Sequence, residues 1–385
     1  MRNIIFKSHK AIDFCDDVRD GTHDSPKHLD SGKILITSKN IKGDIIDFEN
    51  ISYISEEDFN KINERSLVEK NDILYSMIGT IGLVYRVDCD PDYAIKNMGL
   101  FKISNELKSK WLYYFLKTPK TMNMIYSKLN GSTQKFISLS NLRNLEIEYP
   151  EDENDAKRIV KLLESIDYRI RINSEINNNL YEMGDNLYNE YFGKYKDNLP
   201  SDYKIVKLNE VADNYDSKRK PMSSREREQH RGIYPYYGAT SIIDYIDDYI
   251  FDDIYLLMGE DGTVKTNDGY PVLQYIWGKN WINNHAHVLK GKNISTELLM
   301  FALRKINIEN IITGAVQPKI NQENMNKIEF VIGSVSKNKE LEDILKNLMD
   351  KSKNIIEENK KLEELRDELL PKLMNGEIDL DNIEI

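Results

Sequence analysis

The sequence has few of the features that define secreted, membrane-spanning or disulfide-stabilised proteins. Its 385 residues include only two cysteines, Cys15 and Cys89. That count argues against a disulfide framework and fits a reducing compartment. No apolar run approaches 18 residues, so we expect no transmembrane helix. Residues 1–7 contain no signal-peptide apolar region. These absences predict a cytoplasmic protein with no membrane partner.

Known catalytic signatures are also missing. The chain has no Gly-x-x-x-x-Gly-Lys-Ser/Thr phosphate loop. It has neither the Asn-Pro-Pro-Tyr nor the Asp-Pro-Pro-Tyr motif of DNA amino-methyltransferases. The motifs Gly-x-Ser-x-Gly and His-Glu-x-x-His are absent too. We therefore expect no catalytic residue, no metal and no cofactor bound by this chain.

The histidines leave two local questions open. His285 and His287 would share one face of a strand, as a metal pair can. No third ligand lies near them in sequence, so we interpret the segment as a structural strand. His23 lies in residues 20–26, whose Gly, Asp, Ser and Pro content is typical of a turn. A polar contact from the tip of that turn is the alternative.

Two long stretches, residues 155–195 and 338–374, have the apolar spacing of helices. Gly184 interrupts the first, and Gly193 and Gly376 follow where C-cap glycines are expected. Strict sevens in the second stretch are typical of a coiled coil. We expect these helices to bind partners, and their apolar seam residues are Ile159, Leu162, Ile166, Ile176, Leu180, Leu341, Leu348, Ile355, Leu362 and Leu369.

The rest of the chain predicts two globular blocks of mixed α/β structure. We place them at residues 1–150 and 198–336, with helical segments at 151–197 and 337–385. Strands are expected at 33–41, 72–87, 254–258 and 285–289, where β-branched and aromatic residues gather. Helices are expected at 107–129 and 295–306, the second with Ser295 as its N-cap.

The two halves of the chain repeat each other at a shift of 183 residues. Gly131 then meets Gly314, and matched positions continue through both helical stretches. Further upstream we place Gly79 opposite Gly259, a shift of 180. An old duplication without functional meaning is one interpretation. We favour the other, in which two diverged globular blocks bind different ligands on one repeated frame.

Several segments carry side chains that suit DNA. The net charge of −11 argues against a general nucleic-acid coat, but residues 218–231 hold six cations against two glutamates. Amides and lysines can pair with base edges, and hydroxyls can bind phosphate. A solvated loop would explain the same cations. The candidate DNA-binding residues are Thr22, His23, Lys39, Asn40, Lys42, Thr133, Gln134, Lys135, Lys218, Arg219, Lys220, Arg225, Tyr236, Tyr237, Gln317 and Lys319.

Together these segments resemble the specificity subunit of Type I restriction–modification systems over essentially the whole chain. In the first half the resemblance rests on residues 20–26, 37–43, 72–74, 79–82 and 131–134. In the second half it rests on 236–240, 259–262 and, most specifically, 365–378. The acidic junction at 151–155 departs from the family, which often has a Pro- and Gln-rich run there.

The resemblance implies two target-recognition domains that each read half of a split, asymmetric double-stranded DNA sequence. It implies that two long antiparallel helices hold those domains apart. Two modification subunits with S-adenosylmethionine, and restriction subunits using ATP and Mg, would be the partners. The chain itself would be non-catalytic. Three other classes stay open: a DNA-mimic inhibitor, a coiled-coil scaffold that does not read DNA, and a free-standing methyltransferase, against which the missing motifs speak.

Overall fold

The computed structural model describes residues 4–131, 135–314 and 317–378. The chain forms two compact units. Unit 1 combines residues 1–171 with 359–385, and unit 2 is residues 172–358. The domain boundaries predicted from sequence, at residues 150, 197 and 336, lie instead at the ends of the long helical segments. They remain a prediction. Within the described residues, no helix is long and apolar enough to cross a membrane.

Each unit is built on a four-stranded antiparallel sheet, and the two sheets have the same topology. The order is β2-β10-β7-β8 in unit 1 and β13-β20-β17-β18 in unit 2. The strands of the first sheet are Asp17–Asp20, Met98–Lys102, Ile73–Ser76 and Val84–Arg86. Those of the second are Ala212–Asn214, Ala286–Gly291, Tyr255–Gly259 and Leu273–Ile276.

A second sheet in each unit contains one parallel pair, β3 with β9 or β14 with β19. Its order is β6-β3-β9 in unit 1 and β15-β14-β19-β16 in unit 2. These strands are Ser52–Ile54, Lys33–Ile36 and Tyr93–Ile95, then Ile242–Ile246, Arg231–Tyr237, Lys279–Ile282 and Phe251–Asp252. A two-stranded ladder completes each unit: β1 (Phe6–Lys10) with β11 (Glu146–Pro150), and β12 (Lys204–Lys207) with β21 (Glu329–Ile332). The predicted mixed α/β class and the duplication are confirmed.

The core of unit 1 forms around α3 (Glu106–Lys117). Trp111 is fully buried there and donates its indole N–H to the carbonyl of Glu148 at 2.8 Å. Phe101 from the sheet and Leu163 from α6 (Glu153–Tyr191) join the same cluster. So does Leu373 from α11 (Val335–Met374). The two ends of the chain therefore share one core.

The core of unit 2 forms around α9 (Thr296–Leu303). The Ser295 hydroxyl accepts a hydrogen bond from the Leu298 N–H at 3.1 Å, so the predicted N-cap is confirmed. Phe301 packs so closely on α6 that a Cβ at Gly184 would lie 2.3 Å from its ring. This close approach explains the glycine that interrupts the helical pattern. Leu341 and Leu345 of α11 close the cluster.

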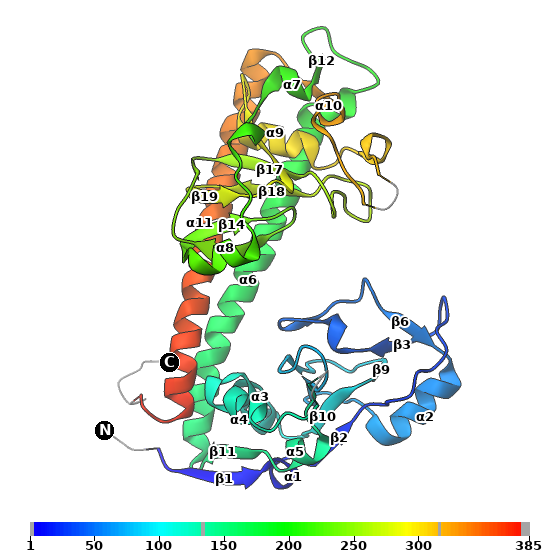
Figure 1. The fold of residues 1–385 in the computed structure, drawn as a ribbon, viewed down its shortest axis with the longest axis vertical. Helices are drawn as coiled ribbons and strands as arrows, with labels where there is room; N and C mark the ends of the chain where they lie inside the picture. The colour runs from blue at the N-terminus through cyan, green and yellow to red at the C-terminus, as the bar shows by residue number, and fades with distance from the viewer. Residues whose placement is uncertain (1–3, 132–134, 315–316, 379–385) are drawn as a thin grey trace. The chain divides into compact units, whose positions relative to one another are not determined.

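Within each unit, α6 and α11 run side by side and antiparallel (Figure 1). In unit 1, Asn359 donates to the carbonyl of Ile170 at 3.2 Å. In unit 2, Ser352 donates to Asn177, and the Tyr191 hydroxyl donates to Glu340 at 2.8 Å. Residue numbers rise along α6 as those of its partners fall, which confirms the predicted antiparallel packing.

Some helix boundaries differ from the sequence prediction. Gly376 ends α11 at φ +69°, with the Gly376 and Glu377 N–H groups bonded to Leu373 and Lys372 carbonyls, so that C-cap is confirmed. The C-cap expected at Gly193 is wrong, because α6 ends at Tyr191 and Gly193 begins a 3₁₀ turn without a positive φ.

The single helix expected at 107–129 is divided in two. The hydroxyl of Thr118 caps a second helix, α4 (Pro119–Tyr126), by accepting from the Thr121 N–H at 3.2 Å. The proline at its first position favours a helix start. The remaining elements are α1 (Ala11–Phe14), β4 (Ile41–Lys42), β5 (Ile45–Ile46), α2 (Glu56–Ser66), α5 (Leu139–Arg143), α7 (Leu208–Val211), α8 (Ser224–Gln229) and α10 (Gln322–Met325).

Two predicted alignments also change. The strand expected at 33–41 ends at Ile36, because residues 38–40 form a 3₁₀ turn. The expected shift of 180 at the glycine turn is wrong. Gly79 and Gly262 share a φ of +78°, and each follows a residue that bridges the later loop, Ile78 to Phe136 and Asp261 to Lys319. The shift therefore stays at 183.

Candidate nucleic-acid interface

In unit 1 a buried acid lies at the end of β2, at a fixed distance from the glycine turn. Asp20 pairs with Gly99 in the β2–β10 ladder. Gly99 pairs in turn with Tyr75 of β7, four positions before Gly79. Asp20 is only 4% exposed, so the cations that it binds are held firmly in place.

Unit 2 has an acid at the same ladder position. The β13–β20 register, continued by the hydrogen bond from the Tyr215 N–H to the Val288 carbonyl, puts Asp216 opposite His287. His287 pairs with Met258, four positions before Gly262. Asp20 and Asp216 are therefore equivalent positions of the repeat.

In unit 2 this acid belongs to a charged cluster. The Arg219 Nη1 lies 2.6 Å from Glu260, and its Nη2 lies 3.5 Å from Asp216. Lys319 lies 3.3 Å from the other oxygen of Glu260. His287 contacts Asp216 through Nδ1 at 2.6 Å and the carbonyl of Ile320 through Nε2 at 2.8 Å. The cluster joins four segments far apart in sequence, and two of them, around Arg219 and Lys319, were predicted to bind DNA.

The cluster contains three possible metal ligands within 4.8 Å of one another: Asp216, Glu260 and His287. Both carboxylates already pair with cations, and both ring nitrogens of His287 have oxygen partners. A metal ion would have to displace Arg219 as well as these hydrogen bonds. His287 lies within β20, as the structural interpretation expected.

In unit 1 the equivalent acid holds its cations at the surface. One Asp20 oxygen forms an ion pair with Arg65, and the other accepts a hydrogen bond from the His23 Nε2 at 2.9 Å. The His23 Nδ1 lies 2.9 Å from Asn97. The hydrogen bond to Asn97, with that to Asp20, raises the pKa of His23 above its usual value. Thr22 accepts from the Asp24 N–H at 3.1 Å and so shapes the same turn.

The predicted segment around Lys39 forms a tight loop. Asn40 is 4% exposed, and its amide bonds to Thr37 and to the carbonyls of Asp47 and Asn50. Its side chain therefore supports the loop from inside, and Lys39 and Lys42 remain exposed on it. Of the second predicted loop, Lys135 is exposed, and Thr133 and Gln134 lie outside the described residues.

In unit 2 the predicted residues divide into exposed and internal groups. Lys218, Lys220, Arg225 and Gln317 are exposed. Arg219 is engaged inside the charged cluster, with 12% of its side chain exposed. Tyr236 is 1% exposed and its hydroxyl accepts from the Met222 N–H at 2.9 Å, and Tyr237 is half-buried. The exposed cations are the groups that a DNA backbone could reach.

Most of the predicted seam residues of the long helices are buried or half-buried. Ile159, Ile166, Leu180, Leu341 and Ile355 are buried, and Ile176 is 36% exposed. Leu162, Leu348, Leu362 and Leu369 are half-buried. Another subunit would therefore meet the outer faces of these helices.

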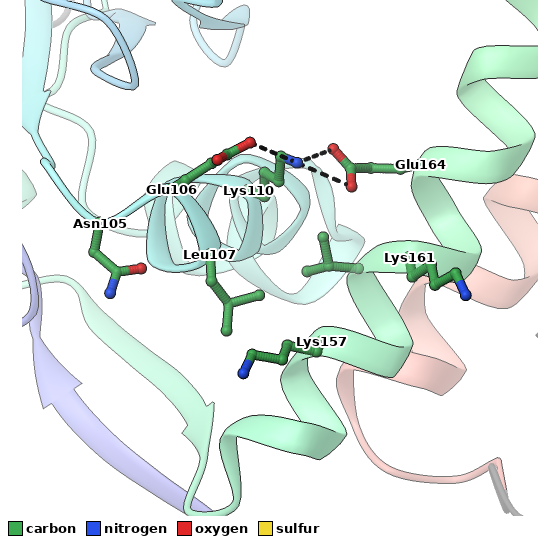
Figure 2. A pocket seen from close by; sticks show the side chains of 8 residues that line it. Asn105, Glu106, Leu107, Lys110, Lys157, Lys161 and Glu164 are labelled. Atoms are coloured by element: carbon green, nitrogen blue, oxygen red, sulfur yellow. Dashed lines mark hydrogen bonds and ion pairs between the residues drawn. The ribbon is translucent and has the colours of Figure 1, made fainter.

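A polar groove of about 510 Å³ lies in unit 1 between α3 and α6. Figure 2 shows Lys110 of α3 between Glu106 of the same helix and Glu164 of α6. The Lys110 Nζ lies 2.8 Å from each carboxylate. Lys157 and Lys161 line the α6 side. The groove holds a carboxylate–ammonium network and offers no nucleophile paired with a base.

Sequence reasoning missed several of these residues. Nothing near Arg65 in sequence marks it, because its partner lies 45 positions earlier and meets it only in the folded unit. Asp216 and Glu260 were not among the predicted site residues. The one available signal was the spacing of an acid and a cation three residues later, which occurs at Asp20–His23 and again at Asp216–Arg219.

Comparison with known proteins places these features in one family. The model of the Type I restriction modification DNA specificity domain matches residues 18–182 and again 200–366. A putative type I restriction enzyme specificity subunit of Haemophilus influenzae is 33% identical over 139 residues. That match takes in 36% of this chain and 35% of the relative, so only about a third of the relative is spanned.

One solved structure shows the same fold. The S subunit of a Type I restriction–modification system from M. genitalium is similar, with 97% of each chain covered, 18% identity and a TM-score of 0.57. A chain from a structure describing complex assembly and conformational transition of the type I R-M system covers 98% of this chain and 100% of its own, at 14% identity and a TM-score of 0.43. Because the family model matches once in each half and takes in most of the sequence, this chain belongs to the Type I restriction–modification DNA specificity family and carries two copies of its domain.

Proposed function

We propose that the chain is the non-catalytic subunit that gives a type I restriction–modification complex its DNA sequence specificity. Each unit would read one half of a split, asymmetric double-stranded target. The observation that carries the proposal is the repeated acid at Asp20 and Asp216, which organises cations beside the predicted DNA loops of both units. Because those cations differ between the units, the two half-sites would differ too.

The candidate contacts follow from exposure. In unit 1 they are the exposed His23, Lys39, Lys42 and Lys135, together with the half-buried Thr22. In unit 2 they are Lys218, Lys220, Arg225, Gln317 and Lys319. Thr133 and Gln134, outside the described residues, remain candidates from sequence. Cations would neutralise phosphates and fix the position of the protein on the duplex.

Partners would supply the chemistry. Two modification subunits carrying S-adenosylmethionine would bind the outer faces of α6 and α11 and methylate adenine within the target. Restriction subunits using ATP and Mg would join the same complex. The net charge of −11 fits this division of work, because a strongly acidic chain gains from partners that attract phosphate. Such a complex would work in the cytoplasm.

The test is to reconstitute the chain with its modification subunit and to sequence the methylated adenines of DNA exposed to the complex. We expect methylation at one split sequence with two different halves. The chain alone should transfer no methyl group from labelled S-adenosylmethionine. A gel shift with and without the modification subunit separates the other classes. A DNA mimic would block binding by the partner, and a scaffold would leave sequence preference unchanged when the chain is omitted.

A further inference from the structure

Arg65 is the penultimate residue of α2, and the surrounding contacts fix the end of that helix. Phe59 and Ile62 of α2 pack in the cluster formed with β3, β6 and β9. The Arg19 Nη1 donates to the Arg65 carbonyl at 3.0 Å. The Lys102 ammonium donates to the carbonyl of Leu67, just beyond the helix, at 2.9 Å. The backbone that carries Arg65 is thus tied to the first sheet.

The guanidinium of Arg65 is oriented but still accessible. Its Nη2 donates to Asp20, whose side chain is 6% exposed, and 59% of the Arg65 side chain is exposed. His23 occupies the other oxygen of Asp20. Among the described contacts, the remaining N–H groups of Arg65 have no further acceptor. The buried Asp20 carboxylate therefore holds the Arg65 guanidinium while most of the Arg65 side chain stays exposed.

In unit 2 the equivalent acid, Asp216, pairs with an arginine that is enclosed. Arg219 donates from Nη1 to Glu260 at 2.6 Å and to the Ala286 carbonyl at 2.7 Å, with little of its side chain exposed. Its donors are used inside the unit. Among the described contacts, the arginine that pairs with Asp20 is therefore largely exposed, whereas the one that pairs with Asp216 is enclosed.

We propose that Arg65 reads a base edge in the half-site contacted by unit 1, with Asp20 as the positioning residue. This inference rests on the proposed function. A guanidinium pairs bidentately with the O6 and N7 of guanine, and that geometry requires a fixed orientation of the fork. A phosphate contact depends less on a fixed fork, because a lysine ammonium can also make it as a point charge. The contact with the buried Asp20 carboxylate supplies that orientation for the Arg65 guanidinium.

The experiment uses the complex of the full chain with its modification subunit and a DNA library randomised over both half-sites. Arg65→Ala and Arg65→Lys should each relax preference at one base pair of one half-site, by about 5- to 150-fold. Asp20→Asn should relax the same position, because the fork loses its support. Lys61→Ala, which removes an exposed cation from the same helix α2, is the matched control and should leave every base preference unchanged.

Two results would overturn the proposal. One is binding that weakens equally on all sequences, with a salt dependence reduced by about one phosphate and full rescue by Arg65→Lys. The other is an unchanged preference in Arg65→Ala. If Asp20→Asn fails to fold by circular dichroism, the two Arg65 variants still decide, because that side chain is largely exposed. The complex that contains the chain without substitutions tests the proposed function separately, since it must methylate a split sequence whatever the Arg65 and Asp20 variants do.

Discussion

Arg366 of α11 pairs with Asp167 of α6, with 3.0 Å between Nη1 and Oδ1. The Tyr114 hydroxyl of α3 donates to the other oxygen of that carboxylate at 2.7 Å. One acid thus ties both long helices to the central helix of unit 1. The pair is mostly enclosed, with 20% and 22% of the two side chains exposed.

Arg366→Ala should lower the free energy of unfolding by about 1–2 kcal/mol, between the values for exposed and buried ion pairs. The matched control is Asp367→Ala. Asp367 also pairs with Arg366, but its side chain is 68% exposed, so its loss should have little effect. Urea unfolding of the full chain measures both. Equal losses would show that Asp167 has no special part in the pairing.

Gly376→Ala should destabilise unit 1 through both strain and contact. Its φ of +69° disfavours any side chain, and a Cβ would lie 2.8 Å from the Phe6 ring. Gly43→Ala separates the two effects, because Gly43 has a φ of +62° and open space around it. We expect about 1–2 kcal/mol for Gly43→Ala and about 1 kcal/mol more for Gly376→Ala. Thermal unfolding measures the stability lost in each variant. Equal losses would mean that the contact with Phe6 contributes nothing to the effect of Gly376→Ala.

The stability of unit 2 should depend on the ionisation of Asp216. Burial disfavours its charge, but the hydrogen bond and charge of His287 hold the pKa of this carboxyl below its usual value. A depressed folded-state pKa gives stability that is complete above the unfolded pKa, near 3.9, and is lost as pH falls through the folded value. Urea midpoints from about pH 5 to pH 2.5 should fall less steeply for Asp216→Asn than for the parent. If the urea midpoints of the two proteins fell equally steeply with pH, the Asp216 carboxylate would not be responsible for the loss of stability.

The exposed cations of unit 2 should act together on DNA. Replacing Lys218, Lys220 and Arg225 by Ala should weaken binding by the assembled complex on all sequences. It should also reduce the salt dependence by up to about three phosphates. Arg219→Ala is the contrasting variant, because Arg219 is engaged with Glu260 and its loss should lower stability first. An unchanged salt slope in the triple variant would mean that these side chains face solvent only.

If α6 and α11 set the unread gap between half-sites, lengthening both should lengthen the gap. Asn177 faces Ser352, and Ile170 faces Asn359. One heptad inserted after Asn173 and another after residue 355 leaves both pairs matched. Seven helical residues add ~10 Å, or about three base pairs.

The methylated sequence of this lengthened variant should keep both half-sites and gain about three unread base pairs. Activity should fall, because the added length also rotates one half-site relative to the other by roughly 100°. The same heptad in α6 alone is the control. It breaks the helix register and should abolish activity. A parental gap with full activity in the double insertion would disprove the role of the helices.

The long helices could be predicted because their signal is local. Heptad spacing marks Leu341, Ile355 and their neighbours whatever surrounds them. The sheets could be outlined but not paired, because β2 meets β10 about 80 residues later, and nothing in either strand specifies the other. Asn40 illustrates a similar limit. Its amide looked suited to a base, but the fold uses it to close a loop.

The candidate site was predicted only in part. Arg219 and Lys319 were singled out as cations, but Glu260, which joins them, was not. The acids Asp20 and Asp216 are 196 positions apart, whereas the helices repeat at 183. Insertions of different length in the two halves hide their equivalence, and only the ladder register reveals it.

The chain order of the two units has a consequence for synthesis. Unit 2 is one continuous stretch and is complete once residue 358 has left the ribosome. Unit 1 begins earlier but needs Leu370, Leu373 and Met374 to close its core. The first half of the protein must therefore wait, with apolar surface open to chaperones and proteases, until the last helix emerges. Ribosomes that stop short of residue 370 would release a chain whose second unit has its whole core and whose first lacks these three residues.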